Sequence, residues 1–412
     1  MSKLRFVITM LTILILYASV ASSLTLDEIR DIASSPEGGD VLLKWVPGGF
    51  WSAPYVDENG VTRQECTWPG LMVTRDDGTT LWIESNFWNI ADGVGENYFR
   101  FINSTDKFAF YVKLENVTTQ WGGVGWATPG AVIVGRAPPQ FAALPAVGGY
   151  SWFSLPMSVN EFIRDYEELY LKVSYELVRA ENTMVRYGLL LWFENPAGGP
   201  LAEVYIAFHD DFGGWAGDRT VVKTITVPLI VDGQLLMGQF EVQRALSGGG
   251  WAAMVFLLKN ADLVNNSVVL DVKPFVEVVF EQMTTYFQVP ADNLVWSNIV
   301  AASYSGSNGT SFEFGWILHD ARLIPPELSP KIIAVTVTET VTTTRTVTNL
   351  IYETETVTET ETKTQSVVTT TTATTTVATT EYQTDYTMTG VAGIALLVVG
   401  FIVGWFMTRK KA

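Results

Sequence analysis

One carboxylate stands inside an apolar, strand-like segment of this chain. Glu203 belongs to the run AEVYIAF, which a Gly/Pro turn separates from an earlier run, YGLLLWF. Runs of this kind predict buried strands, and an unpaired charge is costly to bury. Glu203 therefore either faces solvent from an amphipathic strand or lies at the floor of a substrate cleft. The pattern of this segment alone leaves both alternatives open.

Tryptophan is the second chemical signal. The chain has 14 tryptophans, and most large aromatic side chains belong to a protein core. Three segments differ, because their tryptophans stand next to glycine and polar residues: SNFWNI with Trp88, TQWGGVGWATPG with Trp126, and DDFGGWAGD with Trp215. Such positions are typical of loops or cleft edges, where an aromatic ring offers a flat apolar face to a sugar ring. They favour a glycan cleft.

Composition argues against several other classes of function. The formal net charge is −17, whereas a nucleic acid partner requires clustered Lys and Arg. Cys66 is the single cysteine, and His209 and His319 are the two histidines. We therefore expect no intrachain disulfide, no metal site, no cofactor and no Ser-His-Asp triad. Cys66 itself is expected to be a small buried residue.

The two ends of the chain carry membrane-targeting signals. Residues 1–21 combine a basic start, a short apolar core and a small-residue cleavage site, as in a secretory signal peptide. Residues 388–407 are apolar and long enough to span a bilayer. The basic tail 408–412 predicts a cytoplasmic C-terminus, with the rest of the chain outside the cell. Gly400 and Gly404 have the spacing that lets two such helices pack, which makes weak dimerisation an alternative.

Residues 324–387 form a Pro-containing linker followed by a Thr-rich segment. This segment has almost no aromatic or large aliphatic residues to build a core, so we expect an extended stalk that accepts O-linked sugars. Its Val/Thr alternation also suits a strand, but we find no Gly or Asn turn that would divide it into hairpins. A Thr-rich stalk with a C-terminal anchor resembles surface proteins of archaea. Sequons for N-linked sugar stand at Asn103, Asn116, Asn265 and Asn308.

The part between signal and stalk predicts an all-β fold. Short runs rich in Val, Ile, Tyr, Phe and Trp alternate with Gly, Pro, Asn and Asp, which indicates a two-sheet antiparallel jelly-roll sandwich. One helix is expected over residues 272–287, with Asp271 as its N-cap and Pro274 in its first turn. Its apolar face would pack on a sheet. Residues 22–80 would add edge strands or a small N-terminal subdomain.

The order of motifs over residues 81–323 resembles glycoside hydrolase family 12, the compact jelly-roll endo-β-1,4-glucanases and xyloglucanases. IESNFWNI looks like the family's Asn-Asn-x-Trp strand, and LAEVYIAF looks like Tyr-Glu-x-Met-Ile-Trp-Leu, whose Glu is the nucleophile. DVKPFVEVVFEQM resembles the single helix of the family, and FEFGWILHDARL its closing strand. The resemblance implies a polysaccharide ligand, with Glu203 as candidate nucleophile and with Asn86 and Trp88 on the substrate-binding strand. Trp126 and Trp215 complete the expected contacts.

The chain also departs from the family pattern. The Asp that supports the nucleophile is replaced by Gly188, and the Met after the nucleophile by Tyr205, which we count among the substrate-binding candidates. The Gly-Thr-Glu that supplies the acid/base falls on NIVAASYSG. Ser303 or its neighbour Tyr304 stands there, and we expect Ser303 to be non-functional as an acid.

A retaining glycosidase needs two carboxyl groups about 5–5.5 Å apart. General acid–base assistance is worth roughly 10²–10⁴-fold. Glu313, Asp210 and Asp211 are the alternatives for a substituted acid.

Three functions remain open from the sequence. The first is a membrane-anchored surface protein that binds a β-1,4-glucan-type polysaccharide with weak or absent hydrolysis. The second is an active retaining endo-β-1,4-glucanase with a rearranged acid. The third is a non-catalytic structural protein of the cell envelope with envelope proteins as partners, since a fold does not fix a function. The missing acid favours the first and third over the second.

Overall fold

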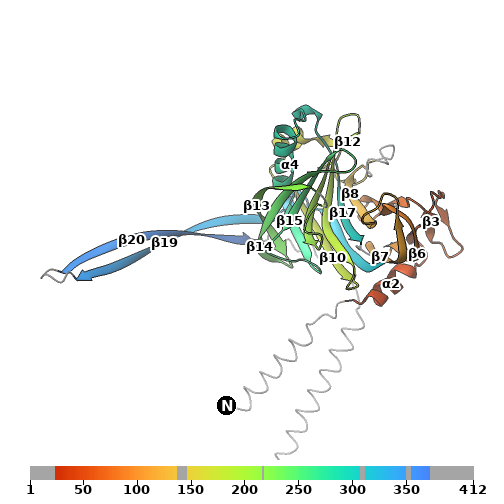
Figure 1. Ribbon diagram of the computed structural model, residues 1–412, viewed down its shortest axis with the longest axis horizontal. Helices are drawn as coiled ribbons and strands as arrows, with labels where there is room; N and C mark the ends of the chain where they lie inside the picture. The colour runs from red at the N-terminus through yellow and green to blue at the C-terminus, as the bar shows by residue number, and fades with distance from the viewer. Residues whose placement is uncertain (1–23, 137–145, 216–217, 307–310, 349–353, 372–412) are drawn as a thin grey trace, which may run out of the picture. The chain divides into compact units, whose positions relative to one another are not determined.

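The computed structural model describes residues 24–136, 146–215, 218–306, 311–348 and 354–371. Among these residues strands predominate and helices are few, as the sequence predicts. The strand pairings define two antiparallel-rich sheets that pack face to face (Figure 1). We call them the front sheet and the back sheet.

The front sheet carries the cleft described below. In spatial order its strands are β4 (Gly70–Thr74), β5 (Thr80–Trp88), β8 (Trp126–Gly135), β17 (Val295–Gly306), β11 (Met184–Glu194), β12 (Pro200–Asp210), β15 (Ala252–Leu258), β14 (Gln234–Leu246) and β13 (Arg219–Val231). All neighbours are antiparallel except β12 and β15, which run parallel. The short strand β9 (Met157–Ser158) pairs with the start of β17.

The back sheet includes the N-terminal strands. In spatial order it contains β2 (Tyr55–Val56), β3 (Thr62–Cys66), β1 (Val41–Trp45), β6 (Ile90–Ile102), β7 (Lys107–Thr119), β18 (Phe312–Leu323), β10 (Tyr170–Arg179) and β16 (Ser267–Asp271). The end of β13 pairs with β16, so β13 links the two sheets at this edge. Residues 22–80 thus contribute strands to both sheets through β1, β3 and β4.

Alternation along each front-sheet strand separates a core face from an outer face. On β12, Val204 and Ile206 are fully buried in the large cluster between the sheets, whereas Tyr205 and Ala207 belong to a smaller apolar cluster on the outer face. The same period of two on β17 sends Ile299 to the core. The hydrophobic pattern therefore fixes which side chains of each strand are available to a ligand.

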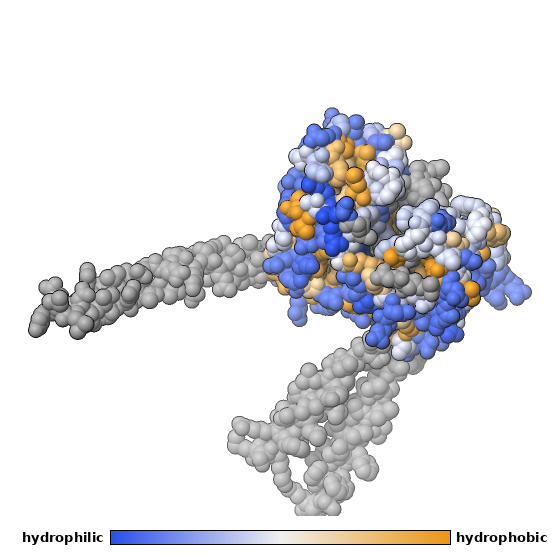
Figure 2. All heavy atoms as spheres, viewed as in Figure 1, coloured by the Kyte–Doolittle hydropathy of each residue, from blue (hydrophilic) through white to orange (hydrophobic). Residues whose placement is uncertain are grey.

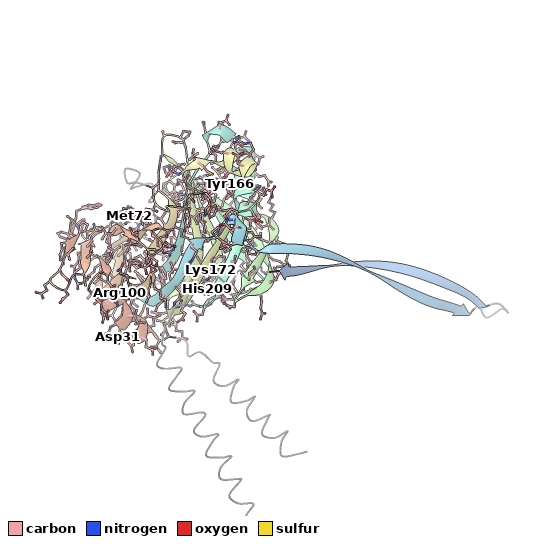
Figure 3. The ribbon with its side chains drawn as sticks, turned by 180° about the vertical axis from the view of Figure 1, so that it is seen from behind. Asp31, Met72, Arg100, Tyr166, Lys172 and His209 are labelled. Atoms are coloured by element: carbon pink, nitrogen blue, oxygen red, sulfur yellow. The ribbon has the colours of Figure 1, made fainter. Side chains whose placement is uncertain are left out.

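Helix α2 (Leu26–Ser34) covers the outer side of the back sheet. Thr25 and Glu28 form a capping box at its start, and its buried residue Ile29 packs on Tyr111 of β7. Arg100 of β6 donates to the Ile32 carbonyl of this helix at 2.6 Å and also forms an ion pair with a buried carboxylate, Asp40. Figure 3 shows Arg100 close to the helix that carries Asp31.

Helix α4 (Lys273–Thr285) packs on the core side of β14 and β15, where Phe275 meets Phe240 and Phe256 edge to face. It is shorter than the predicted range 272–287. The predicted N-cap is wrong: Val272 occupies that position, although the Asp271 carboxylate still accepts from the Lys273 N–H at 3.0 Å.

The sequence prediction of a single helix is also wrong, because α2 and the short α3 (Val159–Asp165) are present. Both were hard to see because they are short, and a helix of seven or nine residues shows few turns of the 3.6-residue period.

The Thr-rich segment contains two paired strands, β19 (Lys331–Thr348) and β20 (Thr354–Thr371). The prediction that no hairpin-like pairing occurs here is therefore wrong, and the high β-propensity of alternating Val and Thr accounts for the pairing. The predicted signal peptide, membrane span, basic tail and the Gly400/Gly404 pair lie outside the described residues. In the described part of the chain, no helix has the length and apolar character that a membrane crossing requires.

The side of the molecule seen in Figure 2 is largely hydrophilic, with separate apolar patches. A hydrophilic surface is consistent with the formal net charge of −17.

Candidate functional site

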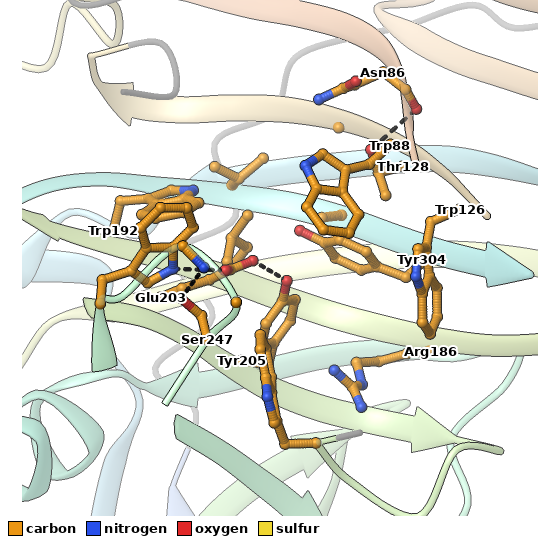
Figure 4. Close-up of a pocket in the computed structure, with 18 of the residues that line it drawn as sticks. Asn86, Trp88, Trp126, Thr128, Arg186, Trp192, Glu203, Tyr205, Ser247 and Tyr304 are labelled. Carbon is orange, nitrogen blue, oxygen red and sulfur yellow. Dashed lines mark hydrogen bonds between the residues drawn. The ribbon is translucent and has the colours of Figure 1, made fainter. Parts of the chain in front are cut away.

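A cleft of about 330 Å³ opens on the outer face of the front sheet, within the usual size range of ligand pockets. Its walls come from β5, β8, β17, β11 and β12 and from the loops around Trp215 and Trp251. Five tryptophans and two carboxylates share it with amide, hydroxyl and small side chains (Figure 4). The main lining residues are Glu84, Asn86, Trp88, Trp126, Thr128, Gly130, Arg186, Trp192, Glu203, Tyr205, Trp215, Trp251, Ala302 and Tyr304.

Glu203 lies in this cleft, and its two oxygens are both hydrogen-bonded. The Tyr205 hydroxyl donates to Oε1, and the Trp251 indole N–H donates to Oε2 at 3.1 Å (Figure 4). Burial raises the pKa of Glu203 above its ordinary value, while these two hydrogen bonds and the charge of Arg186 oppose the rise. Of the two alternatives left open by the sequence, the structure places Glu203 at the cleft.

Two phenols continue from Glu203 along the cleft. The Tyr304 ring packs edge to face on the Tyr205 ring, with centroids 4.8 Å apart, and the two hydroxyls are hydrogen-bonded to each other. Burial and the nearby Glu203 carboxylate raise the pKa of both phenols well above the ordinary value. Both hydroxyls therefore keep their protons at neutral pH and serve as hydrogen-bond donors rather than as acids.

Arg186 organises the cleft wall instead of presenting a free charge. Its guanidinium donates to the Gly214 carbonyl at 2.6 Å and pairs with Asp210 at 3.3 Å, and it lies 4.8 Å from the Tyr205 ring centroid. Asp210 also accepts from the Gly214 N–H at 2.9 Å. These contacts fix the loop that presents Trp215.

Glu84 is the second carboxylate of the cleft and is not among the residues predicted from the sequence. It is 7% exposed, and its Oε2 has no hydrogen-bond partner among the described residues. Burial raises its pKa from 4.5 to about 8, while a hydrogen bond from the Trp82 side chain acts in the opposite direction. A signal was present: Glu84 is two positions before Asn86 on one strand, so both share a face.

The structure brings six of the predicted site residues together in the cleft: Asn86, Trp88, Trp126, Glu203, Tyr205 and Trp215. Ser303 is not among them. It is fully buried on the core-facing side of β17, and its hydroxyl has no partner among the described residues. Its neighbour Tyr304 has the opposite orientation and lines the cleft.

None of the three acids considered as substitutes lines the cleft. Glu313 accepts from the Tyr111 hydroxyl at 2.7 Å and pairs with Lys113 at 3.2 Å on the back sheet. Asp210 supports the Trp215 loop, and Asp211 pairs with Arg179 and His209. Each of these carboxylates thus has a structural partner elsewhere.

The remaining predicted residues lie away from the cleft. Asn103, Asn116 and Asn265 are exposed, and the Asn265 side chain accepts from the Leu177 N–H at 2.7 Å. Asn308 is outside the described residues. Cys66 is buried, and burial raises the pKa of its thiol. In the described ranges no cluster of three or more His, Cys, Asp or Glu could hold a metal ion.

Comparison with solved structures finds polysaccharide hydrolases. The family 12 xyloglucanase from Bacillus licheniformis is 14% identical, with a TM-score of 0.41, and the match covers 62% of this chain and 97% of that one. Endoglucanase Cel12A from Rhodothermus marinus is 15% identical, with a TM-score of 0.37 and coverages of 62% and 96%. The family 11 xylanase from Neocallimastix patriciarum is 13% identical, with a TM-score of 0.36 and coverages of 62% and 95%.

No protein-family model and no curated protein sequence matches this chain. At such identities and TM-scores, its function has to be inferred from its own cleft.

Proposed function

We propose that this protein binds a β-1,4-glucan-type polysaccharide along the outer face of the front sheet, with weak or absent hydrolysis. The observation that supports this most strongly is the set of five tryptophans lining a single cleft together with hydrogen-bonding groups. Flat aromatic faces stack on sugar rings, while carboxylate, amide and hydroxyl groups bind sugar hydroxyls. The Asn86 side-chain oxygen, buried without a partner among the described residues, is one such acceptor.

The cleft is wide enough for more than one sugar ring. Its lining extends from β5 to β12, which are separated by β8, β17 and β11. Four strand spacings of about 4.8 Å give a span of roughly 19 Å along the sheet. Trp88 is 45% exposed at one end, and its ring lies 5.1 Å from that of Trp121, which extends the aromatic surface.

Chemistry at Glu203 is limited because the hydroxyl groups next to it are poor acids. Its carboxylate is held by two donors, as a nucleophile would be, but the neighbouring hydroxyls of Tyr205 and Tyr304 have pKa values well above the ordinary range. A poor acid protonates a departing sugar slowly. Without general acid assistance the rate of hydrolysis would be lower by roughly 10²–10⁴-fold. This favours a binding protein over an endoglucanase.

Affinity electrophoresis of the full-length protein in gels with soluble β-glucan tests this function. We expect the gel to retard the wild-type protein. Trp88→Ala should lower the apparent affinity for the glucan by at least about tenfold. Trp51→Ala should cause no comparable loss of affinity. Trp51 is a matched control, since it is 62% exposed and does not line the cleft. Unchanged mobility of the wild-type protein would contradict the proposal.

A reducing-end assay on the same polysaccharide separates binding from hydrolysis. Little or no release is expected. Rapid release that Glu203→Gln abolishes would instead establish the endoglucanase alternative.

We further propose that the polysaccharide-binding part lies outside the cell, tethered by the C-terminal segment. The supporting features are the signal-like residues 1–21, the apolar residues 388–407 and the basic residues 408–412. Protease added to intact cells should degrade the protein, which should otherwise be recovered in the membrane fraction. Recovery of a protease-protected form in the cytosol would contradict this location.

A further inference from the structure

Glu84 is a carboxyl group at the cleft that has no cation to balance it. It forms no ion pair with any described Lys, Arg or His, and its Oε2 is buried without a hydrogen-bond partner in the described part of the chain. A buried carboxyl without a cation costs free energy. The buried carboxylate Asp40, by contrast, pairs with Arg100. Glu84 lies at the cleft instead.

Glu84 is too distant to serve as the acid partner of Glu203. Glu84 is on β5 and Glu203 on β12, with three strands between them. Their backbone positions are thus roughly 19 Å apart along the sheet, whereas catalytic carboxyl pairs in glycosidases are at most about 9.5 Å apart. Glu84 therefore meets a different part of a bound polymer from the part that meets Glu203.

The sheet leaves room for a ligand substituent beside Glu84. The residue opposite Glu84 on β8 is Gly130, and the next residue across on β17 is Ala302. Both line the cleft. A side chain at Gly130 would crowd Val300, since its Cβ would lie 3.0 Å from Val300 Cγ1. Small residues thus open a space on the side of Glu84 that faces the rest of the cleft.

The charge and aromatic content of the cleft favour a cationic substituent in that space. The titratable groups lining the cleft are Glu84, Glu203, Arg186, Tyr205 and Tyr304. Arg186 is already paired with Asp210, so none of the described lining residues supplies a cation to Glu84. The electron-rich faces of tryptophan also attract cations. A ligand with ammonium groups complements both features.

We propose that the bound polymer has a β-1,4-linked glucan backbone whose sugars carry free amino groups, one of which pairs as an ammonium with Glu84. This inference rests on the proposed function and names its ligand class. Glu84 is then a specificity-determining residue. A carboxyl differs from an amide of the same shape because it can become an anion when a cation arrives, and a nearby cation favours the ionised form.

The proposal predicts a coupled proton release. Burial keeps Glu84 protonated in the free protein at neutral pH, because its pKa is about 8. Pairing with an ammonium lowers this pKa, so binding expels the carboxyl proton to solvent. Tyr205 and Tyr304 do not titrate in this range, since burial holds the pKa of each phenol well above its ordinary value. A neutral sugar would cause no such release at Glu84.

Calorimetric titration of the full-length protein with three pentamers tests the proposal: β-1,4-linked glucosamine, β-1,4-linked N-acetylglucosamine and cellopentaose. Wild type should bind the glucosamine pentamer at least tenfold more tightly than the other two. Titrations at pH 6.0 in two buffers of different ionisation enthalpy should show net proton release with that ligand and none with cellopentaose. The proton measurement requires no variant, so it does not depend on the folding of a mutant.

Glu84→Gln should remove both the preference for the glucosamine pentamer and the proton release. Glu115→Gln, which removes an exposed carboxylate of β7, should keep both. Equal affinity of wild type for all three pentamers, or a preference retained in Glu84→Gln, would overturn the inference and leave the proposed function standing. Failure to bind any pentamer would overturn both.

Discussion

At the scale of single residues, two carboxyls of one cleft have different surroundings. Glu203 accepts hydrogen bonds from Tyr205 and Trp251, and Arg186 is near enough to act on its charge. Glu84 has the Trp82 side chain as its partner and no cationic partner within the described part of the chain. Burial raises the pKa of both carboxyls, but at Glu203 two hydrogen bonds and the charge of Arg186 oppose the rise, whereas at Glu84 only the hydrogen bond from Trp82 does.

The raised pKa of Glu84 makes the folded protein less stable as pH rises. Below pH 4.5 the group is protonated in both folded and unfolded chains, so it imposes no penalty. Between pH 4.5 and about 8 the unfolded chain loses the proton first, and stability falls. At about 1.4 kcal/mol per pKa unit, the decrease is on the order of several kcal/mol.

Glu84→Gln should therefore lose less stability than wild type between pH 5 and pH 8, as measured by urea unfolding. Burial also raises the pKa of Glu194 and Glu203, but both remain in the variant, so the difference between the two proteins isolates Glu84. Glu115→Gln should follow wild type. Parallel curves for Glu84→Gln and wild type would show that Glu84 ionises freely in the folded state.

At the scale of the element, strand β17 decides which hydroxyl reaches a ligand. Tyr304 lines the cleft, while Ser303 points into the core, where its hydroxyl has no hydrogen-bond partner among the residues that the structure describes. Ser303→Ala should leave glycan affinity unchanged and keep or raise stability, since an unpaired buried hydroxyl is costly. Tyr304→Phe should weaken binding several-fold. Calorimetry with the same oligosaccharide measures both, and the reverse pattern would mean that the face assignment of β17 is wrong.

This strand also shows how far the sequence could predict the site. The sequence predicted β12 from its alternating pattern, and it predicted a loop or cleft-edge position for Trp88 from the polar residues around it. In both segments the residues of one face differ in character from their neighbours. On β17 the run IVAAS offers no contrast, since residues of both faces are small or apolar. The sequence could not separate Ser303 from Tyr304 for this reason.

Glu84 was missed for a different reason. Its significance depends on what faces it across the sheet, Gly70 on β4 and Gly130 on β8, and the pairing with Gly130 joins strands that are not consecutive in the chain. The residue pattern within one segment predicts which side chains share a face of the strand. It does not predict which residues of another strand lie opposite them.

Arg100 of β6 joins helix α2 to the back sheet through a hydrogen bond and also forms a buried ion pair with Asp40. The Arg100 and Asp40 side chains are 8% and 3% exposed, with 2.6 Å between Nη2 and Oδ2, and Arg100 also donates to Ile32 of the helix. Arg100→Met would leave a buried carboxylate uncompensated, so we expect a loss of about 3–5 kcal/mol in urea unfolding.

Arg164→Met is the matched control. Arg164 pairs with Asp165 at 2.6 Å, but at an exposed position, and exposed pairs contribute little. Equal effects of the two substitutions would show that the Arg100 pair is not buried in solution.

At the scale of the whole molecule, the core between the two sheets provides stability, and the outer face of the front sheet is available for ligand binding. The core between the sheets is apolar and continuous, and it takes in N-terminal strands such as β1 as well as the strands of the cleft. The formal net charge of −17 disfavours binding of other polyanions and favours an ammonium-bearing polymer. The outer face of the front sheet remains free for a ligand because the back sheet and α4 cover the opposite side.

The most direct test is a crystal structure of the full-length protein with a bound β-1,4-linked pentasaccharide. We expect sugar rings on the outer face of the front sheet, with one ring stacked on Trp88 and another in hydrogen-bond contact with Glu203. A pentasaccharide bound elsewhere on the molecule, with these two side chains uncontacted, would contradict the assignment of this cleft.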